Sequence, residues 1–384
     1  MKLALQLGYK NLVGAGLRTW LNAGVLSFCF IIIIFFNGLI DGWNQQARID
    51  STEWEVANGH LLHENYDTSD PFSIKDGHGE LPQQENLTPV LIRQASIYPD
   101  GRMVNISLKG IKPAQQTIKL PTQLLSTSDA EIPAIIGKRM ANAAKLKKGD
   151  QVLLRWRDKN GTFDAANITI VDVFDCNVAT IDAGQVWISM DKLWEMTGLN
   201  NRATYLIANN KYQHQNIAHW NFKDKEELLQ ELTNLIETKK VSGAIFYLLL
   251  LTIALLAIFD TQVLSIFRRQ KEIGTYISLG MTRWEVVKLF TVEGSFYSIF
   301  GMLLASIYGT PLLIYIAKKG IAFPSEAADG MGISISDVIH PVFGLSLIVG
   351  TIVLVIISAT IVSFLPARKI AKMNPVLALK GKVQ

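Results

Sequence analysis

The sequence predicts an α-helical integral membrane protein with four transmembrane helices and a large mixed α/β extracytoplasmic domain between spans one and two. Four long apolar runs occur along the 384 residues, and a polar segment of about 200 residues, large enough for a domain with its own core, follows the first run. Only 18% of the residues are charged, where a soluble domain has roughly 25%. This deficit excludes a disordered acidic chain and argues against an ordinary cytosolic enzyme.

Each apolar run is long enough to cross a bilayer. A spanning helix needs about 20 apolar residues, because the hydrocarbon core is about 30 Å thick and each residue adds about 1.5 Å. A buried core helix would explain one such run, but four in one chain argue against it. The first run lacks the small-residue cleavage pattern of a signal peptide, which favours a retained anchor. We expect transmembrane helices at residues 23–41, 241–267, 289–317 and 342–365.

The distribution of lysine and arginine orients these spans, because basic residues favour cytosolic loops. They gather before the first span, between spans two and three, and after span four, whereas the loop between spans three and four is acidic on balance. We therefore expect both termini in the cytosol. The predicted cytosolic parts are an amphipathic helix at residues 1–22, a loop at 268–288 and a tail at 366–384, and the outer parts are residues 42–240 and 318–341.

The large outer segment shows signals for both strands and helices. Residues 152–154 and 168–174 have the pattern of strands around a turn at residues 158–161, and residues 185–189 form another apolar strand. A short helix is expected at residues 190–196. The charged stretch 223–240 carries leucines on one helical face, so we expect it to run straight into the second span as a stalk.

No catalytic constellation is evident, and we predict no cofactor bound by this chain. The phosphate-binding pattern G-x-x-x-x-G-K-[ST] is absent, so the chain should lack an ATPase site of its own. His60 and His63 lie in a strand-like pattern that would point them to opposite faces, so we predict no metal site. Cys29 and Cys176 lie in unrelated segments, and we expect two unpaired thiols. A net charge of +4 is too small to indicate a nucleic-acid partner.

Two acidic residues lie within or near the ends of the spans, where charges are costly and often functional. Asp260 lies eight residues before Arg268 and fits a carboxylate at the cytosolic interface. Glu293 lies one turn into span three, where it is either interfacial or in contact with a neighbouring helix. Both are candidate intramembrane polar sites.

The cytosolic loop 268–288 is the most informative segment. Its pattern is that of a helix broken by Gly274 and Gly280, and a membrane protein without its own ATPase suggests that the loop docks a partner. A simple basic loop that sets topology is the alternative. Arg269, the run 272–274, Leu279-Gly280 and Thr282 resemble the [R/K]-x-x-E-I-G-x-x-[R/K]-A-L-G-A-[S/T] signature of the MacB/LolC/LolE/FtsX permeases, the type VII ABC transporters. Residues 365–379 are similar to that family's P-A-x-x-A-x-x-x-x-P-x-x-A-L ending.

The resemblance implies that the loop forms a coupling helix, which seats in a groove of a separate ATPase subunit. The residues expected to couple the two subunits are Lys271, Glu272, Gly274, Leu279, Gly280, Met281, Thr282 and Arg283. The implied partners are an ABC ATPase dimer, which binds ATP and Mg, and a second permease in a homo- or heterodimer. The implied location is the bacterial inner (cytoplasmic) membrane.

Motifs in the outer segment resemble those of lipoprotein-releasing LolC/LolE-like permeases. The matching segments are residues 56–60, 110–113, 135–141, 146–150 and 174–189. Residues 155–167 are too short for the hook with which LolC proteins hold a periplasmic lipoprotein carrier, and this counts against the closest match. MacB-like efflux and FtsX-like regulation of a cell-wall hydrolase are the alternatives to lipoprotein release.

Lipoprotein cargo would need a place for its acyl chains. The resemblance implies a groove built from apolar side chains that face outward from the first two spans. The expected residues are Phe30, Ile34, Phe246 and Leu249. Residues that merely face lipid would show the same pattern, so that alternative stays open.

Overall fold

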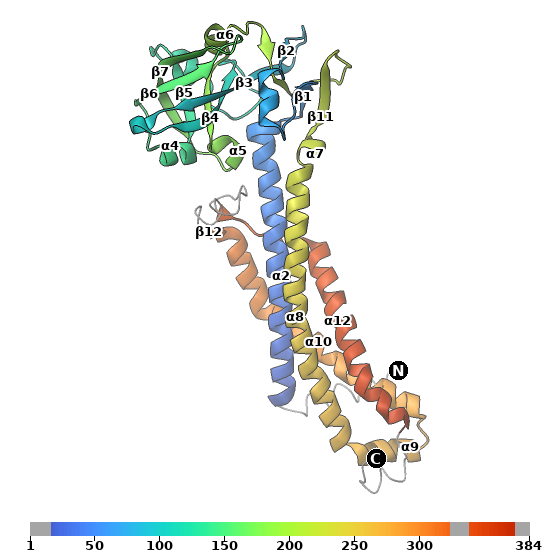
Figure 1. The fold of residues 1–384 in the computed structure, drawn as a ribbon. Coiled ribbons are helices and arrows are strands. Elements are labelled where there is room, and N and C mark those ends of the chain that lie inside the picture. The colour runs from blue at the N-terminus through green and yellow to red at the C-terminus, as the bar shows by residue number, and fades with distance from the viewer. Residues whose placement is uncertain (1–16, 323–337, 373–384) are drawn as a thin grey trace. The chain divides into compact units, whose positions relative to one another are not determined.

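The computed structural model describes residues 17–322 and 338–372, and Figure 1 shows their helices and strands. The chain divides into two compact units. The helical unit holds residues 17–42, 236–321 and 340–372, and the barrel domain holds residues 43–235 with 322 and 338–339. Residues 1–16, 323–337 and 373–384 lie outside the described residues, and with them most of the predicted amphipathic helix, part of the outer loop and most of the cytosolic tail.

Four long helices coincide with the four apolar runs. They are α2 (Leu17–Ser51), α8 (Gln230–Arg268), α10 (Arg283–Lys319) and α12 (Leu345–Ala367). Each is long and apolar enough to cross a membrane, which fits a membrane protein. α2 continues past residue 41, the predicted end of the first span. α8 runs unbroken from residue 230 into the second apolar run, as predicted for the charged stretch 223–240. The first residues of that stretch differ from the prediction, because residues 223–224 end a strand and residues 225–228 form a separate short helix.

Glycines of α10 let that helix approach α2 closely. A Cβ atom placed on Gly301 would lie 2.9 Å from Leu26 Cβ, and one on Gly309 would lie 2.7 Å from the Ile31 side chain. Any larger residue would therefore push the two helices apart. Small residues are common at such contacts, because lipid provides no hydrophobic drive for helix association and close van der Waals packing replaces it.

Two glycines of α2 make room for the segment that leads into α12. A Cβ atom on Gly42 would lie 2.9 Å from Pro341 Cα, and one on Gly38 would collide with the ring of Phe343. The Val342 N–H donates to the Gly38 carbonyl at 2.9 Å. This close backbone contact fixes where α12 begins.

Two of the long helices are each followed directly by a short helix. α9 (Gln270–Ser278) comes directly after α8, and the 3₁₀ helix η4 (Arg368–Lys372) comes directly after α12. The predicted helical loop between the second and third spans is therefore present as α9. The break predicted at Gly274 is wrong, because α9 runs through this buried glycine, whereas the helix ends before Gly280 as expected. The short strands β12 (Ile321–Ala322) and β13 (Val338–Ile339) precede and follow residues 323–337 in the chain.

The barrel domain is built on a nine-stranded sheet in the order β11-β1-β10-β3-β4-β8-β5-β7-β6. A further pairing of β3 with β6, between residues 95–97 and 154–156, closes the strands from β3 to β6 into a barrel. Closure leaves these strands without open edges, while β10, β1 and β11 extend the sheet beyond β3. The strands of this sheet are β1 (Gly59–His63), β3 (Leu87–Ile97), β4 (Val104–Ile111), β5 (Pro133–Gly137), β6 (Gln151–Arg157), β7 (Phe163–Phe174), β8 (Gln185–Ser189), β10 (Tyr205–Ala208) and β11 (Trp220–Asp224).

The predicted strands are confirmed, and β6 shows how alternate side chains enter the core of the barrel. In β6, Val152, Leu154 and Trp156 are buried while the residues between them are exposed, which is the alternation expected of a strand with one apolar face. The buried side chains pack with those of β3, β4, β5, β7 and β8 into one core. The turn between β6 and β7 contains Gly161, whose φ of 82° favours glycine.

Short helices complete the mixed α/β domain that the sequence predicts. The helix expected at residues 190–196 is present as α6. Cys29 and Cys176 are both free and buried, as expected of two unpaired thiols. The helical segments of the domain are η1 (Thr52–Val56), η2 (Pro71–Lys75), η3 (Pro99–Gly101), α3 (Leu124–Thr127), α4 (Lys138–Ala144), α5 (Ala179–Asp182), α6 (Met190–Thr197) and α7 (Lys225–Leu228).

Candidate functional site

A buried ion pair fixes the junction between α8, α9 and α10. Arg269, the residue between α8 and α9, donates from Nη1 to both carboxylate oxygens of Glu293 at 2.9 Å. Its Nε donates to Oε2 of Glu272, in the first turn of α9, at 2.7 Å. The guanidinium carbon also lies 4.8 Å from the centre of the Phe290 ring, a cation–π contact. One side chain thus connects the end of α8, the start of α9 and the first turns of α10.

Because this ion pair is buried, losing either partner would be costly to the stability of the fold. Glu293 is only 5% exposed, and the Arg269 side chain is largely covered. Removing one partner of such a pair costs several kcal/mol, on the order of 3–5, because the other charge stays buried without compensation. Of the two sequence-based alternatives for Glu293, the structure shows the contact with a neighbouring element. Arg269 was identified only as a motif residue, and its role needed the structure.

Apolar contacts seat α9 against the ends of the long helices. Ile273 and Gly274 are buried, and Ile273 packs with Ile266 of α8 and Phe290 of α10. Ile370 of η4 belongs to the same cluster, so the end of α12 contacts it as well. α9 is therefore a packed part of the helical unit and not a loose connector.

The opposite face of α9 and the turn after it are exposed. Lys271 and Glu272 are exposed, and Leu279 is 79% exposed although it is a large apolar side chain. Trp284, at the start of α10, is exposed as well. Two large apolar side chains therefore lie exposed beside charged ones at this end of the helical unit.

The turn between α9 and α10 is held by a positive-φ glycine, by a capping box and by contacts of two side chains with neighbouring elements. Gly280 has a φ of 100°, and a Cβ atom there would meet nothing within 4 Å, so glycine is needed for backbone conformation and not for space. Thr282 caps α10 through a capping box with Glu285. Met281 is half-buried beside the α9 cluster, and Arg283 Nη1 donates to the Ala371 carbonyl of η4 at 3.2 Å.

Inside the apolar helices the structure locates polar groups that the sequence analysis did not single out. Gln262 of α8 is 1% exposed, and within the described residues neither atom of its amide has a hydrogen-bond partner. A Cβ atom on Gly294 of α10 would lie 2.7 Å from its Nε2 and would collide with Ser363 of α12. Three helices thus meet at this point. The signal was available, since Gln262 is a polar residue within a long apolar run.

Asp260 lies apart from that meeting point. Its side chain is exposed, and no ion pair or hydrogen bond to it is found among residues 17–322 and 338–372. The neighbouring residue Thr261 faces inward and accepts from Asn22 Nδ2 of α2 at 2.9 Å. The buried polar side chains in this part of α8 are therefore Thr261, which bonds to α2, and Gln262, and not Asp260.

The four residues of the predicted acyl-chain groove do not lie together. Phe30 is 1% exposed, so the prediction that it faces outward is wrong. Phe30 and Ile34 line an apolar pocket of about 350 Å³ between α2, α10 and α12. Phe246 and Leu249 are exposed on α8, away from that pocket. Helical spacing places residues on a face, but neighbouring helices decide which faces are covered.

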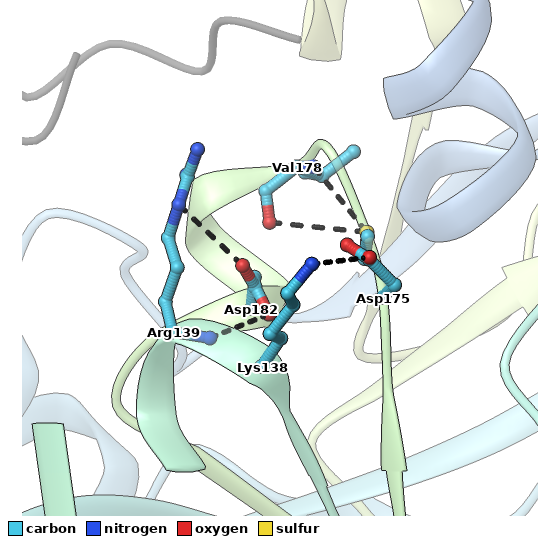
Figure 2. Close-up of polar contacts among 6 residues, drawn as sticks. Lys138, Arg139, Asp175, Val178 and Asp182 are labelled. Carbon is cyan, nitrogen blue, oxygen red and sulfur yellow. Dashed lines mark hydrogen bonds and ion pairs between the residues drawn. The ribbon is translucent and has the colours of Figure 1, made fainter. Parts of the chain in front are cut away.

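Two of the motif segments of the barrel domain meet at one buried carboxylate, shown in Figure 2. Asp182 accepts from the Arg139 backbone N–H at 3.2 Å and lies 3.5 Å from Arg139 Nε. Gly137 allows this approach, since a Cβ atom there would lie 2.5 Å from Asp182 Cα. Nearby, Lys138 Nζ donates to Asp175 Oδ2 at 2.7 Å. These contacts give the motif residues 137–139 and 182 a structural role in holding the start of α4.

The buried thiol in the same view is not suited to chemistry. Cys176 Sγ accepts from the Val178 N–H at 3.3 Å (Figure 2). Burial raises the pKa of this thiol to about 12, so it stays protonated. A protonated, buried cysteine is a poor nucleophile.

Comparison with known proteins identifies the part of the chain that contains α9. Residues 244–375 match the family model of the FtsX-like permease C-terminal domain. An uncharacterized ABC transporter permease of Methanocaldococcus jannaschii is 28% identical over 132 residues, which cover 34% of this chain and 30% of the relative. The matched region thus spans less than a third of the relative's length.

A solved structure is similar to part of the chain. It is the extracellular domain of the noncanonic ABC-type transporter YknZ from Gram-positive bacteria, at 13% sequence identity and a TM-score of 0.26. The similarity covers 46% of this chain and 95% of that domain. Arg269 and Glu293 both lie within the matched residues 244–375. Residues 244–375 are therefore similar in sequence to the FtsX-like permease C-terminal domain, and 132 residues of the chain are similar to an ABC transporter permease.

Proposed function

We propose that this protein is the permease subunit of a type VII ABC transporter that couples ATP hydrolysis by a separate ATPase subunit to movement of its outer domain. The observation that supports this most directly is the Arg269–Glu293 junction, which joins an exposed docking face on α9 to two long apolar helices. A push on a rigidly held short helix is transmitted to the helices it is bound to, whereas a push on a flexible loop is absorbed.

The docking face consists of the exposed residues of α9 and of the turn after it, and their side chains indicate the kind of partner that it would bind. Leu279 and Trp284 offer apolar contacts, and Lys271 and Glu272 offer charges at the edge. Such a combination fits a groove on a protein partner, because apolar anchors supply affinity and the polar rim supplies orientation. The proposed partners are an ATPase dimer that holds ATP and Mg and a second permease subunit. The chain itself would contribute no catalytic residue.

Contacts between α2 and α8 offer a route by which motion reaches the outer domain. In the helical unit, Lys240 Nζ donates to Asp41 Oδ1 at 2.9 Å. In the barrel domain, Arg48 Nη1 donates to Thr233 Oγ1 at 3.0 Å. Because both helices cross from one unit into the other, we propose that they act as a paired stalk.

For the cargo we propose lipoproteins, released from the inner membrane. The outer-segment motifs resemble those of LolC/LolE-like permeases, and the pocket of about 350 Å³ beside Phe30 and Ile34 has the apolar lining that an acyl chain requires. MacB-like efflux and FtsX-like regulation of a cell-wall hydrolase are the competing functions. In the second of these nothing would be transported.

The coupling role is tested by Gly280→Val in the full complex in lipid. A valine at a φ of 100° is strained by roughly 1–2 kcal/mol or more, so the turn should rearrange and displace Leu279. We expect reduced ATPase recruitment and loss of cargo-stimulated hydrolysis, with the barrel domain still folded. Gly350→Val is the matched control, since its Cβ also meets open space but its φ is not positive. Wild-type recruitment and hydrolysis in Gly280→Val would remove the coupling role.

The cargo is tested by photo-crosslinking from position 34, in the pocket, and from position 249, on the exposed face of α8. We expect an acylated protein to be captured from position 34 and bulk lipid from position 249, because only the first lines an apolar pocket. Capture of peptides or small drugs would favour efflux. Absence of any cargo, together with a captured cell-wall hydrolase, would favour the regulatory function.

A further inference from the structure

A large cleft on the barrel domain is not used by the proposed function. Its volume is about 1310 Å³, and it is bounded by η2, the second half of β3, the first residues of β4, the end of β6, the turn after β6 and the residues that follow α6. All of these belong to the barrel domain, so the cleft is complete within one unit.

The lining of this cleft is strongly cationic. Among residues 43–235, none of its lysines and arginines forms an ion pair, whereas Arg48, Lys119 and Lys138 elsewhere in the domain each do. The acidic lining residues are Asp76 and Asp158, and the Asp158 carboxylate already accepts backbone N–H groups of its own turn. The cationic lining residues are Lys75, Arg93, Arg155, Arg157, Lys159 and Arg202.

The arginines are held in place without being neutralised. Arg155 and Arg157 lie on the exposed face of β6, and their guanidinium carbons lie 3.8 Å and 4.2 Å from the centre of the Phe163 ring. Arg93 donates to the carbonyl oxygens of Ile74 and Lys75 at 3.3 Å and 3.2 Å. The aromatic partner fixes the orientation of Arg155 and Arg157 but leaves their positive charge available, which is the preorganisation that an anionic ligand exploits. Arg93 is only 7% exposed and has Asp76 and Asp158 as neighbouring charges, so it supports the cleft from below.

Apolar side chains stand among these charges. Phe72 of η2 is 83% exposed, and Met103 and Phe163 are exposed as well. An inorganic anion or a lipid headgroup would fill only a small part of 1310 Å³ and would leave these apolar groups in water. A peptide segment can match both the spread of the charges and the apolar positions between them.

We propose that this cleft binds an acidic segment of a partner protein, in which carboxylate side chains are interspersed with apolar ones. The carboxylates meet Arg155, Arg157 and the other unpaired cations, and the apolar side chains cover Phe72 and Met103. A cleft lined by charges of one sign also concentrates a ligand of opposite sign and speeds its association. The site stands apart from ATP coupling and would exist under any of the three candidate functions.

The test measures binding of a fluorescein-labelled decapeptide of alternating glutamate and leucine to the full chain in neutral phosphatidylcholine nanodiscs, by fluorescence anisotropy. The wild-type protein should bind it, more tightly at low salt, and should bind the glutamine analogue at least about tenfold more weakly. Arg155→Glu combined with Arg157→Glu should weaken binding by at least about tenfold. Phe72→Ser should weaken it by a smaller factor.

The matched control is Lys112→Glu combined with Lys211→Glu, which changes the net charge equally at exposed positions outside the cleft. Its binding should equal that of the wild type, and the melting temperatures and near-ultraviolet circular dichroism of both double variants should match the wild type. Equal binding of the glutamine analogue, or equal loss in both double variants, would overturn the proposal. So would loss of binding to phosphatidylglycerol vesicles in the cleft variant without peptide binding by the wild type, since the cleft would then serve lipid headgroups.

Discussion

Arg269 shows how one side chain can organise a junction of three helices. Its guanidinium has several donors in a fixed plane, and the structure uses them on Glu293 and Glu272 at once. A lysine would offer one ammonium point and could not satisfy both carboxylates in the same geometry. The buried pair is therefore better understood as fixing the direction in which α9 leaves α8 than as a source of stability.

Lys109 is a buried lysine of the barrel domain that forms no ion pair among the described residues. It lies on β4, is 6% exposed, and places its Nζ 4.9 Å from the centre of the Trp187 ring and 5.9 Å from that of Tyr205. Burial lowers the pKa of Lys109 to about 8, and the charge of Glu55 only partly offsets this. The two rings favour the charged form but do not replace its lost hydration.

We predict that Lys109→Met stabilises the protein at pH 7 by about 2–3 kcal/mol and removes a pH dependence. Between pH 8 and 10.5 the unfolded chain holds a proton on Lys109 that the folded chain has lost, so wild-type stability should rise with pH through this range. The measurement is thermal unfolding of the purified full chain in detergent from pH 7 to pH 10.5.

The control for Lys109→Met is Lys112→Met, which removes a nearby exposed lysine. It should leave both the melting temperature and its pH dependence unchanged. Destabilisation of Lys109→Met at pH 7, or an unchanged slope between pH 8 and 10.5, would mean that the buried ammonium is well compensated.

At the scale of elements, small residues decide how α10 packs. Gly301 and Gly309 admit side chains of α2, and Gly294 admits Ser363 of α12. These glycines weaken the helix intrinsically, by about 1 kcal/mol each relative to alanine, and close packing offsets that cost. At these positions the sequence of α10 is thus constrained by its neighbours.

We predict that Gly294→Ala destabilises the helical unit by about 1–3 kcal/mol, because the added methyl group would overlap Ser363 and press on Gln262. Combining it with Ser363→Gly should recover much of the loss, since the overlapping atoms are removed. Melting temperatures of the two single variants and the double variant in detergent form the required cycle.

Gly350→Ala serves as the control for this cycle. Its Cβ would meet nothing within 4 Å, so the change should be neutral or stabilising by up to about 1 kcal/mol. A double variant no more stable than Gly294→Ala would show that Ser363 is not the obstacle and that Gln262 or the backbone is.

At the scale of the molecule, an entire barrel domain is inserted into a chain of long apolar helices. It follows α2 and precedes α8, and both helices extend well beyond the length needed to cross a membrane. In the topology that we propose, this insertion would give the chain one element for a partner on each side of the membrane: α9 in the cytosol and the cationic cleft outside.

Topology is tested with single cysteines at position 160, in the turn after β6, and at position 271, on α9. An impermeant thiol reagent added to intact spheroplasts should label Asn160→Cys and spare Lys271→Cys, because we expect these positions on opposite sides of the membrane. Both are exposed, and they avoid Asp158 and Thr282, whose side chains fix the turn and cap α10. The buried native cysteines should give little background.

Permeabilised spheroplasts provide the control for access, and there both variants should be labelled. Equal labelling of the two in intact spheroplasts would contradict the proposed orientation. Labelling of Lys271→Cys alone would reverse it, and would move the docking face of α9 to the outside.

The sequence by itself determined the features that depend on local pattern. Apolar run length located the four long helices, alternation located β6 and β7, and the helical pattern after Arg268 located α9 and its end before Gly280, although not its passage through Gly274. These properties follow from a helix or strand period and from the backbone preferences of single residues, so neighbours in sequence suffice to reveal them.

Only the tertiary structure decided which distant residues meet. It paired Arg269 with Glu293, brought Gln262 to Gly294 and Ser363, covered Phe30, and closed β3 onto β6 to form a barrel. It also gathered the unpaired cations of η2, β3 and β6 into one cleft. The physical reason is that burial, charge pairing and sheet closure depend on packing between elements far apart in the chain, and packing has no period that a single sequence displays.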